Sequence, residues 1–166
     1  MLAMTDGTEL LRSNAMNAEG IMLAVGAVIR DAEGRLLLVR HKRERGGYWQ
    51  GKWICPGGRL EPGETLAEGA LREVREETHL DIKLGKILAP FETIVREGDT
   101  VRLHVVYVDF LADLVGGELK PDDDIAEAEW WDQSTLARRW YELHHDTQRL
   151  LTIAGCVPEL PSSSLQ

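Results

Sequence analysis

The chain has 166 residues, 43% of them hydrophobic and 28% charged, which suits one globular domain with a single core. Its net charge of −9 argues against a nucleic-acid-binding protein, because a phosphate backbone requires a basic surface. The 2 cysteines, Cys55 and Cys156, are too few for a disulfide framework. We see no signal peptide and no apolar run near the ~20 residues of a membrane span. We therefore expect a cytoplasmic protein without membrane partners.

The first third of the chain predicts an extension followed by a hairpin. Residues 1–20 show weak periodicity and are expected to form an N-terminal extension. The continuous apolar run 21–30, which has β-branched character, and residues 35–40, separated from it by a turn, predict two paired strands. A basic loop follows at 41–51, and residues 52–55 are expected to form a short strand before a Pro-Gly-Gly turn.

Residues 65–80 predict a helix. Thr65 and Glu68 match a capping box, in which each side chain satisfies the other's backbone amide, and apolar residues recur one turn apart behind them. Gly69 weakens a helix by about 1 kcal/mol relative to alanine. A glycine here indicates that another part of the chain packs closely against this turn.

The second half predicts two further strands and a helix. Residues 101–114 are almost uniformly apolar, which is typical of a central strand covered on both faces. A strand at 126–132 and a helix at 134–154 follow. The expected fold is therefore an α/β (α+β) class α/β/α sandwich with a mixed β-sheet between helices. We expect one domain over residues 21–155 and a tail at 156–166.

Carboxylates are concentrated in the second half of the predicted helix. Glu73 and Glu77 lie one turn apart, where like charges destabilise a helix by roughly 0.2–0.5 kcal/mol, and no basic residue lies one turn from either. Acidic groups are also unfavourable near a helix C-terminus. The pairing of Arg72 with Glu76 supports a simple solvated face, whereas the unpaired acids favour a bound divalent cation. Mg²⁺ prefers such oxygen ligands, and a structural calcium loop is absent from the sequence.

The flanking residues extend this pattern into a longer motif. Gly58 precedes Glu64 by five intervening residues, and seven more separate Glu64 from the run Arg-Glu-Val-Arg-Glu-Glu at 72–77. His79 and Leu80 complete the motif. This arrangement resembles the signature of the Nudix hydrolases and matches it at eight of nine specified positions. The departure is His79, where the family has glycine.

The resemblance implies a pyrophosphohydrolase that uses Mg²⁺ or Mn²⁺ to cleave a nucleoside diphosphate linked to another group. Position for position, it implies metal ligands at Glu73, Glu76 and Glu77, a backbone carbonyl ligand at Gly57 or Gly58, Arg72 as the residue that orients the carboxylates, and Glu64 as a secondary ligand or ion-pair partner. One of these acids, or a loop acid, would activate water. We favour Asp124 as a further metal ligand from the acidic loop at 122–127, although a solvated loop is the alternative.

Substrate contacts are less clearly marked in the sequence. Four basic residues before the signature are candidates for phosphate binding, although they would equally suit a solvated loop: Arg40, Lys42, Arg43 and Arg45. Trp53, Trp49 or Tyr48 could stack on a base, with packing in the core or hairpin as the alternative.

The resemblance leaves several substrates open. Residues 92–98 lack the proline that is typical of ADP-ribose hydrolases in this family, which favours a nucleoside triphosphate, damaged or non-standard nucleotides included. ADP-ribose or another sugar nucleotide is the alternative, and a non-catalytic nucleotide-binding regulator is an alternative of another class. Dimers are common in the family.

His79 is expected to keep the left-handed backbone that the signature glycine would adopt at the end of the helix. Among non-glycine residues, histidine is enriched in that conformation. The alternative is that the helix ends differently and tilts Glu76 and Glu77.

Overall fold

The computed structural model describes residues 20–158, so the expected extension lies outside the described residues except for Gly20. A 7-stranded sheet has the order β4-β6-β1-β2-β7, with β3 paired to β1 and β5 paired to β6. β1 and β6 are parallel and the other pairs are antiparallel, so the sheet is mixed as predicted. The strands are β1 (Met22–Arg30), β2 (Leu36–His41), β3 (Gly57–Arg59), β4 (Leu80–Ile87), β5 (Phe91–Glu97), β6 (Thr100–Gly117) and β7 (Ile125–Trp131).

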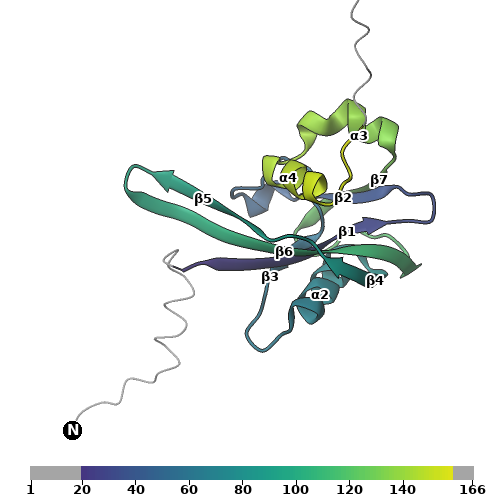
Figure 1. The fold of residues 1–166 in the computed structure, drawn as a ribbon, viewed down its shortest axis with the longest axis horizontal. Coiled ribbons are helices and arrows are strands. Elements are labelled where there is room, and N and C mark those ends of the chain that lie inside the picture. The colour runs from purple at the N-terminus through teal and green to yellow at the C-terminus, as the bar shows by residue number, and fades with distance from the viewer. Residues whose placement is uncertain (1–19, 159–166) are drawn as a thin grey trace, which may run out of the picture.

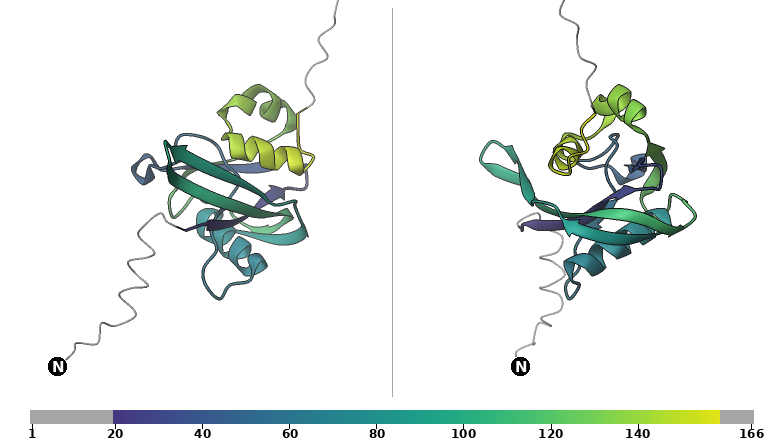
Figure 2. Two further views of the ribbon diagram at one scale, coloured as in Figure 1. Left: turned by 60° about the vertical axis from the view of Figure 1, so that its left-hand side comes forward. Right: turned by 45° about the vertical axis from the view of Figure 1, so that its right-hand side comes forward.

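Helices cover both faces of the sheet, which confirms the α/β/α sandwich (Figure 1). Helix α2 (Leu66–Thr78) packs on one face, while α3 (Gln133–Arg139) and α4 (His145–Ile153) lie on the other (Figure 2). Val74 of α2 belongs to one buried cluster, and Leu151 of α4 belongs to another. Among the described residues, no helix is long and apolar enough to cross a membrane.

β6 is a central strand, as its apolar sequence predicts, but it is not covered along its whole length. Its middle pairs with β1 on one side and with β4 on the other. Its first part pairs with β5 in a hairpin that extends beyond the helices (Figure 1), and residues 100–104 are exposed or half-buried. The expectation of cover on both faces is therefore wrong for this part of the strand.

The predicted strand at 52–55 is also wrong. Trp53 and Ile54 form only isolated bridges, and the strand lies instead at β3, where we expected a turn. Glycine explains the difference, because a Cβ atom on Gly57 would lie 2.6 Å from the backbone oxygen of Val25. The missing side chain lets this segment approach and pair with β1.

The single helix expected at 134–154 is divided into α3, the 3₁₀ turn Trp140–Glu142 and α4. Extended backbone at Leu143 and His144 separates the pieces. This backbone pairs with Trp53, whose N–H donates to the Glu142 oxygen at 3.0 Å and whose oxygen accepts from the His144 N–H at 2.9 Å. The bridge with Trp53 occupies the Glu142 oxygen and the His144 N–H, so one continuous helix cannot run through these residues.

Candidate active site

Helix α2 begins and ends at the residues that the sequence indicates. The Glu68 N–H donates to Thr65 Oγ1 at 3.1 Å and the Thr65 N–H to Glu68 Oε2 at 2.8 Å, which completes the capping box. His79 ends the helix in the left-handed conformation, with φ of 61°, as predicted. Its Nε2 lies 2.7 Å from Asp122 Oδ2. Gly69 packs closely as expected, because an added Cβ would lie 2.7 Å from Leu60 Cδ1.

Arg72 is the centre of the charged side of α2. Its Nη1 donates to Glu73 Oε1 at 2.8 Å and to Glu76 Oε2 at 3.2 Å, and its Nη2 donates to Glu64 Oε2 at 3.1 Å. The hydrogen bond from Arg72 holds the pKa of Glu64 below its ordinary value. The sequence suggested that Glu73 has no basic partner, because no basic residue lies one turn away. The structure shows that the adjacent Arg72 is its partner.

Glu77 has a different environment. It is 2% exposed, and its Oε2 accepts a hydrogen bond of 3.1 Å from the Gly57 N–H. Burial, followed by the negative charges of Glu73 and Asp124, raises the pKa of Glu77 well above its ordinary value. No basic side chain of residues 20–158 forms an ion pair with it. A buried carboxylate in this position requires a compensating cation or a proton.

The acidic loop before β7 closes over this carboxylate. Candidate ligand atoms of Glu77, Asp124 and His41 all lie within 4.8 Å of one another, whereas Glu73, Glu76 and Glu77 are not brought together in this way. The Asp122 N–H donates to the Glu77 backbone oxygen at 3.0 Å, which ties the loop to the end of α2. Burial, and then Arg45, lowers the pKa of His41, so its imidazole is neutral at pH 7.

The two signature glycines make room for these acids. A Cβ atom on Gly58 would lie 2.5 Å from Cδ and Oε2 of Glu73. Burial raises the pKa of Glu73, and the hydrogen bond from Arg72 opposes that shift. β3 thus carries Gly57 against Glu77 and Gly58 against Glu73, with no side chain between the strand and the carboxylates.

The four basic residues predicted to bind phosphate are dispersed. Arg45 forms an ion pair with Asp124 at the acidic cluster, and Lys42 Nζ donates to the backbone oxygen of Asp123 at 2.7 Å. Arg40 pairs with Glu127 on the neighbouring strand, while the exposed Arg43 lies in the 3₁₀ turn Arg43–Arg45. The structure therefore brings Arg45 and Lys42 to the acidic loop.

Trp53 does not face a substrate site in this structure, so its assignment as a base-stacking residue is corrected. Its side chain is 1% exposed, and its ring centroid lies 5.5 Å from that of Trp131. The guanidinium groups of Arg40 and Arg139 lie 5.0 Å and 5.3 Å from the ring centroid. Trp53 is a core residue, which was the alternative interpretation.

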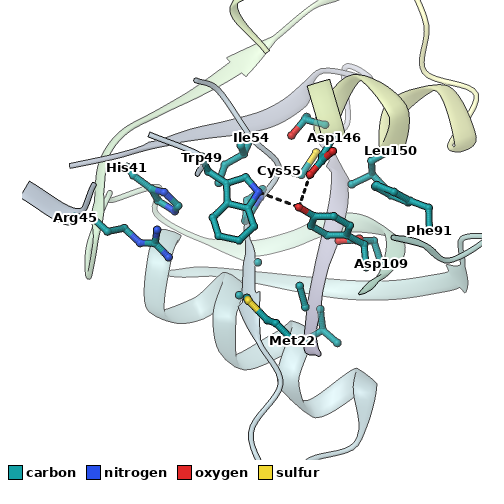
Figure 3. Close-up of a pocket in the computed structure, with 17 residues that line it drawn as sticks. Met22, His41, Arg45, Trp49, Ile54, Cys55, Phe91, Asp109, Asp146 and Leu150 are labelled. Carbon is teal, nitrogen blue, oxygen red and sulfur yellow. Dashed lines mark hydrogen bonds between the residues drawn. The ribbon is translucent and has the colours of Figure 1, made fainter. Parts of the chain in front are cut away.

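A pocket adjoins the carboxylates, between the sheet and α4 (Figure 3). His41, Arg45, Gly57 and Gly58 line it and also contact the acidic cluster. The remaining wall is largely apolar and aromatic. Phe91 and Tyr107 are stacked there with ring centroids 4.7 Å apart. Such a pocket can hold a flat ring while the attached phosphates reach the carboxylates.

Sequence reasoning missed several residues of this pocket. Asp109 could have been found, because it is the one acid within the apolar run 105–112. Phe91, Tyr107 and Asp146 carry no such signal. Phe91 and Tyr107 are cross-strand partners in the β5–β6 hairpin, and Asp146 reaches them only through the packing of α4 on the sheet.

Comparisons with known proteins agree with this geometry. An ADP-ribose pyrophosphatase of Methanocaldococcus jannaschii is 35% identical over 116 residues, which cover 70% of this chain and 64% of that protein. The 8-oxo-dGDP phosphatase NUDT18 of Danio rerio is 34% identical over 122 residues, which cover 70% of this chain and 34% of that protein. A solved structure of a MutT protein from Methanosarcina mazei Go1 has a TM-score of 0.66 at 25% identity and covers 84% of this chain and 98% of that chain.

The matched region is thus less than two thirds of the length of each of these two curated relatives. The family model of the NUDIX domain matches residues 20–150. This range includes the complete signature helix, the acidic loop and the start of α4. The chain belongs to the Nudix family.

Proposed function

We propose that this chain is a metal-dependent pyrophosphohydrolase that cleaves a nucleoside diphosphate linked to another group. The preferred substrate is a nucleoside triphosphate, which it converts to a nucleoside monophosphate and pyrophosphate. The observation that carries the proposal is the grouping of buried Glu77 with Asp124 beside a partly aromatic pocket, whose lining residues Gly57 and Arg45 contact these two acids. The catalytic domain is proposed to span residues 21–155.

The donor set fits a hard divalent cation. Nudix hydrolases generally need a divalent metal, and carboxylate oxygens are the ligands that Mg²⁺ and Mn²⁺ prefer. Glu77 is buried without a basic partner among the described residues, and burial, followed by the negative charges of Glu73 and Asp124, raises its pKa. We propose that Glu73, Glu76, Glu77 and Asp124 hold the ion, with Glu64 and a backbone carbonyl of Gly57 or Gly58 completing the site.

Hydrolysis of the anhydride requires that a water oxygen attacks phosphorus while the bond to the bridging oxygen breaks. The bound ion would neutralise phosphate charge and lower the pKa of the water. A carboxylate of the cluster accepts the proton that the water loses. Arg72 keeps Glu73 and Glu76 in place through its hydrogen bonds. Arg45 and Lys42, at the acidic loop, are positioned to contact the released pyrophosphate.

The first relatives act on different substrates, so the substrate must be measured. One is named as an ADP-ribose pyrophosphatase and the other as an 8-oxo-dGDP phosphatase. ADP-ribose is therefore the second candidate substrate, favoured by the 35% identity to the archaeal protein. Both candidates place an anhydride at the carboxylates and a nucleoside in the aromatic pocket.

The test is a panel of nucleoside triphosphates, ADP-ribose and sugar nucleotides assayed with Mg²⁺ and with Mn²⁺. With a nucleoside triphosphate, release of pyrophosphate rather than orthophosphate would identify the bond that is cut; with ADP-ribose or a sugar nucleotide, cleavage of the anhydride would give a nucleoside monophosphate and a sugar phosphate. Glu77→Gln should abolish hydrolysis while the protein stays folded, because the amide keeps the shape of the side chain and removes its charge. Near-wild-type turnover in Glu77→Gln would contradict the assignment. Nucleotide binding without cleavage of any member would indicate a regulator instead.

A further inference from the structure

Most polar side chains on the inner wall of the pocket are paired with one another. Trp49 Nε1 donates to the Tyr107 hydroxyl at 3.0 Å, and that hydroxyl donates to Asp146 Oδ2 at 2.6 Å (Figure 3). The other carboxylate oxygen of Asp146 accepts from Thr93 Oγ1 at 2.9 Å. These hydrogen bonds hold the rings of Trp49 and Tyr107 in place, and they leave these side chains few free donors or acceptors for a ligand.

Two groups that line the pocket are exceptions: the buried Nδ1 of His41, which has no hydrogen-bond partner among the described residues, and the carboxyl group of Asp109. Asp109 lines the pocket from the middle of β6 and is 7% exposed. Among residues 20–158, no backbone or side-chain donor forms a hydrogen bond with its carboxyl group, and burial raises the pKa of Asp109 to about 7. Buried polar groups in native proteins are nearly always hydrogen-bonded, and a carboxylate without a partner is costly. A purely structural acid would be expected to have partners.

The sheet is built to accommodate this carboxyl group. Gly26 lies directly opposite Asp109 in the parallel register of β1 and β6. A Cβ atom on Gly26 would lie 2.8 Å from Asp109 Oδ1 and 2.4 Å from the Pro56 backbone oxygen. Glycine therefore keeps space for the carboxyl group between β1, β3 and β6. The neighbouring Cys55 is a protonated thiol, because burial and the charge of Asp109 raise its pKa.

We propose that Asp109 is a specificity-determining residue that accepts a hydrogen bond from an exocyclic amino group of the base held in this pocket. Bases that carry such a group, adenine, guanine or cytosine, would be bound in preference to otherwise identical rings that lack it. The inference rests on the proposed function, since it assumes that the pocket holds the nucleoside end of the substrate.

The test compares ligands that differ only in the amino group. ATP is paired with purine riboside triphosphate, and GTP with ITP, in assays at pH 8, where the carboxylate form prevails. In the wild-type protein, loss of the amino group that faces Asp109 should lower kcat/KM on the order of tenfold or more. Asp109→Leu should abolish this discrimination, and Asp109→Asn, which keeps one acceptor oxygen, should retain part of it.

Asp113→Asn is the matched control, because Asp113 is an exposed acid on the same strand and does not line the pocket. The ratio of kcat/KM values within each pair should be unchanged in this control, and Mn²⁺ affinity should be unchanged in every variant. A purely structural role would lower activity on both members of a pair equally, and an unchanged ratio in Asp109→Leu would overturn the inference.

Equilibrium binding separates this inference from the proposed function. AMP, GMP, IMP and purine riboside monophosphate are titrated into the metal-free protein, so no hydrolysis is needed. If the wild-type protein cleaves no nucleotide, the hydrolase proposal fails, and the binding ratios alone decide the role of Asp109. Tighter binding of the amino-bearing member, lost in Asp109→Leu, supports the inference. Equal affinities, or no binding of any member, would contradict it.

Discussion

Replacing Gly58 with alanine should inactivate the metal site without unfolding the protein. The new Cβ atom would lie 2.5 Å from Cδ and Oε2 of Glu73, whereas ordinary van der Waals contacts begin near 3.4 Å. Glu73 must therefore retreat by roughly 1 Å, and a displacement of this size at a reacting centre lowers rates on the order of 10²-fold. The side chain can yield by rotation, at a cost in unfolding free energy of about 1 kcal/mol.

The assays for Gly58→Ala are hydrolysis of the best substrate, Mn²⁺ affinity by calorimetry or electron paramagnetic resonance, and urea unfolding. We expect the first two to fall and the third to change little. Gly116→Ala is the matched control, because the nearest atom to its Cβ would be 3.7 Å away. If Gly58→Ala keeps wild-type turnover and Mn²⁺ affinity, Glu73 does not need its present position, and its proposed role as a ligand is refuted.

Three further predictions concern stability. His79→Gly should raise the free energy of unfolding by about 0.5–1 kcal/mol with unchanged kcat, because relief of the left-handed backbone outweighs the loss of the exposed pair with Asp122; lost activity would reveal a role for the imidazole. Thr65→Ala should lower it by about 1 kcal/mol through loss of the capping box, and unchanged urea unfolding would contradict this. Asp109 stays protonated up to pH about 7 in the folded state, whereas its ordinary pKa is 3.8, so its burial lowers stability as pH rises between these values. Asp109→Asn should therefore gain stability relative to wild type between pH 4 and pH 8, by up to about 4 kcal/mol, and a pH-independent difference in urea unfolding would argue against the raised pKa.

The parts of the fold that sequence predicts well are those specified by short-range interactions. The boundaries of α2 follow from Thr65 and Glu68 at one end and His79 at the other, all of which act within one turn of the helix. The continuous apolar runs 21–30 and 35–40 likewise locate β1 and β2 to within one or two residues. The bounds of these elements can be predicted because they depend on capping residues and on apolar runs within the elements themselves.

The errors lie where distant segments meet. Residues 134–154 have a helical sequence pattern, but the backbone is extended at Leu143 and His144, where the chain pairs with Trp53. The residues around Trp53 in the sequence do not indicate that its ring will pack against Trp131 in the core. The pocket shares this property, because Tyr107 and Asp146 become neighbours only when α4 packs on the sheet. One sequence considered alone does not indicate which distant residues will come into contact.

The concentration of acids on α2 is compensated in two different ways, and the difference bears on how an ion would bind. Arg72 already neutralises Glu73 and Glu76 through Nη1, so these two carboxylates are held in place without an ion. Glu77 has no such partner among the described residues and is protonated or costly until a cation arrives. Most of the gain in free energy on ion binding should therefore come from Glu77, because Arg45 already pairs with Asp124 and Arg72 fixes the oxygens of Glu73 and Glu76 in advance. Preorganisation of this kind lets the helix tolerate its like charges in the metal-free protein and still offer a strong site to the ion.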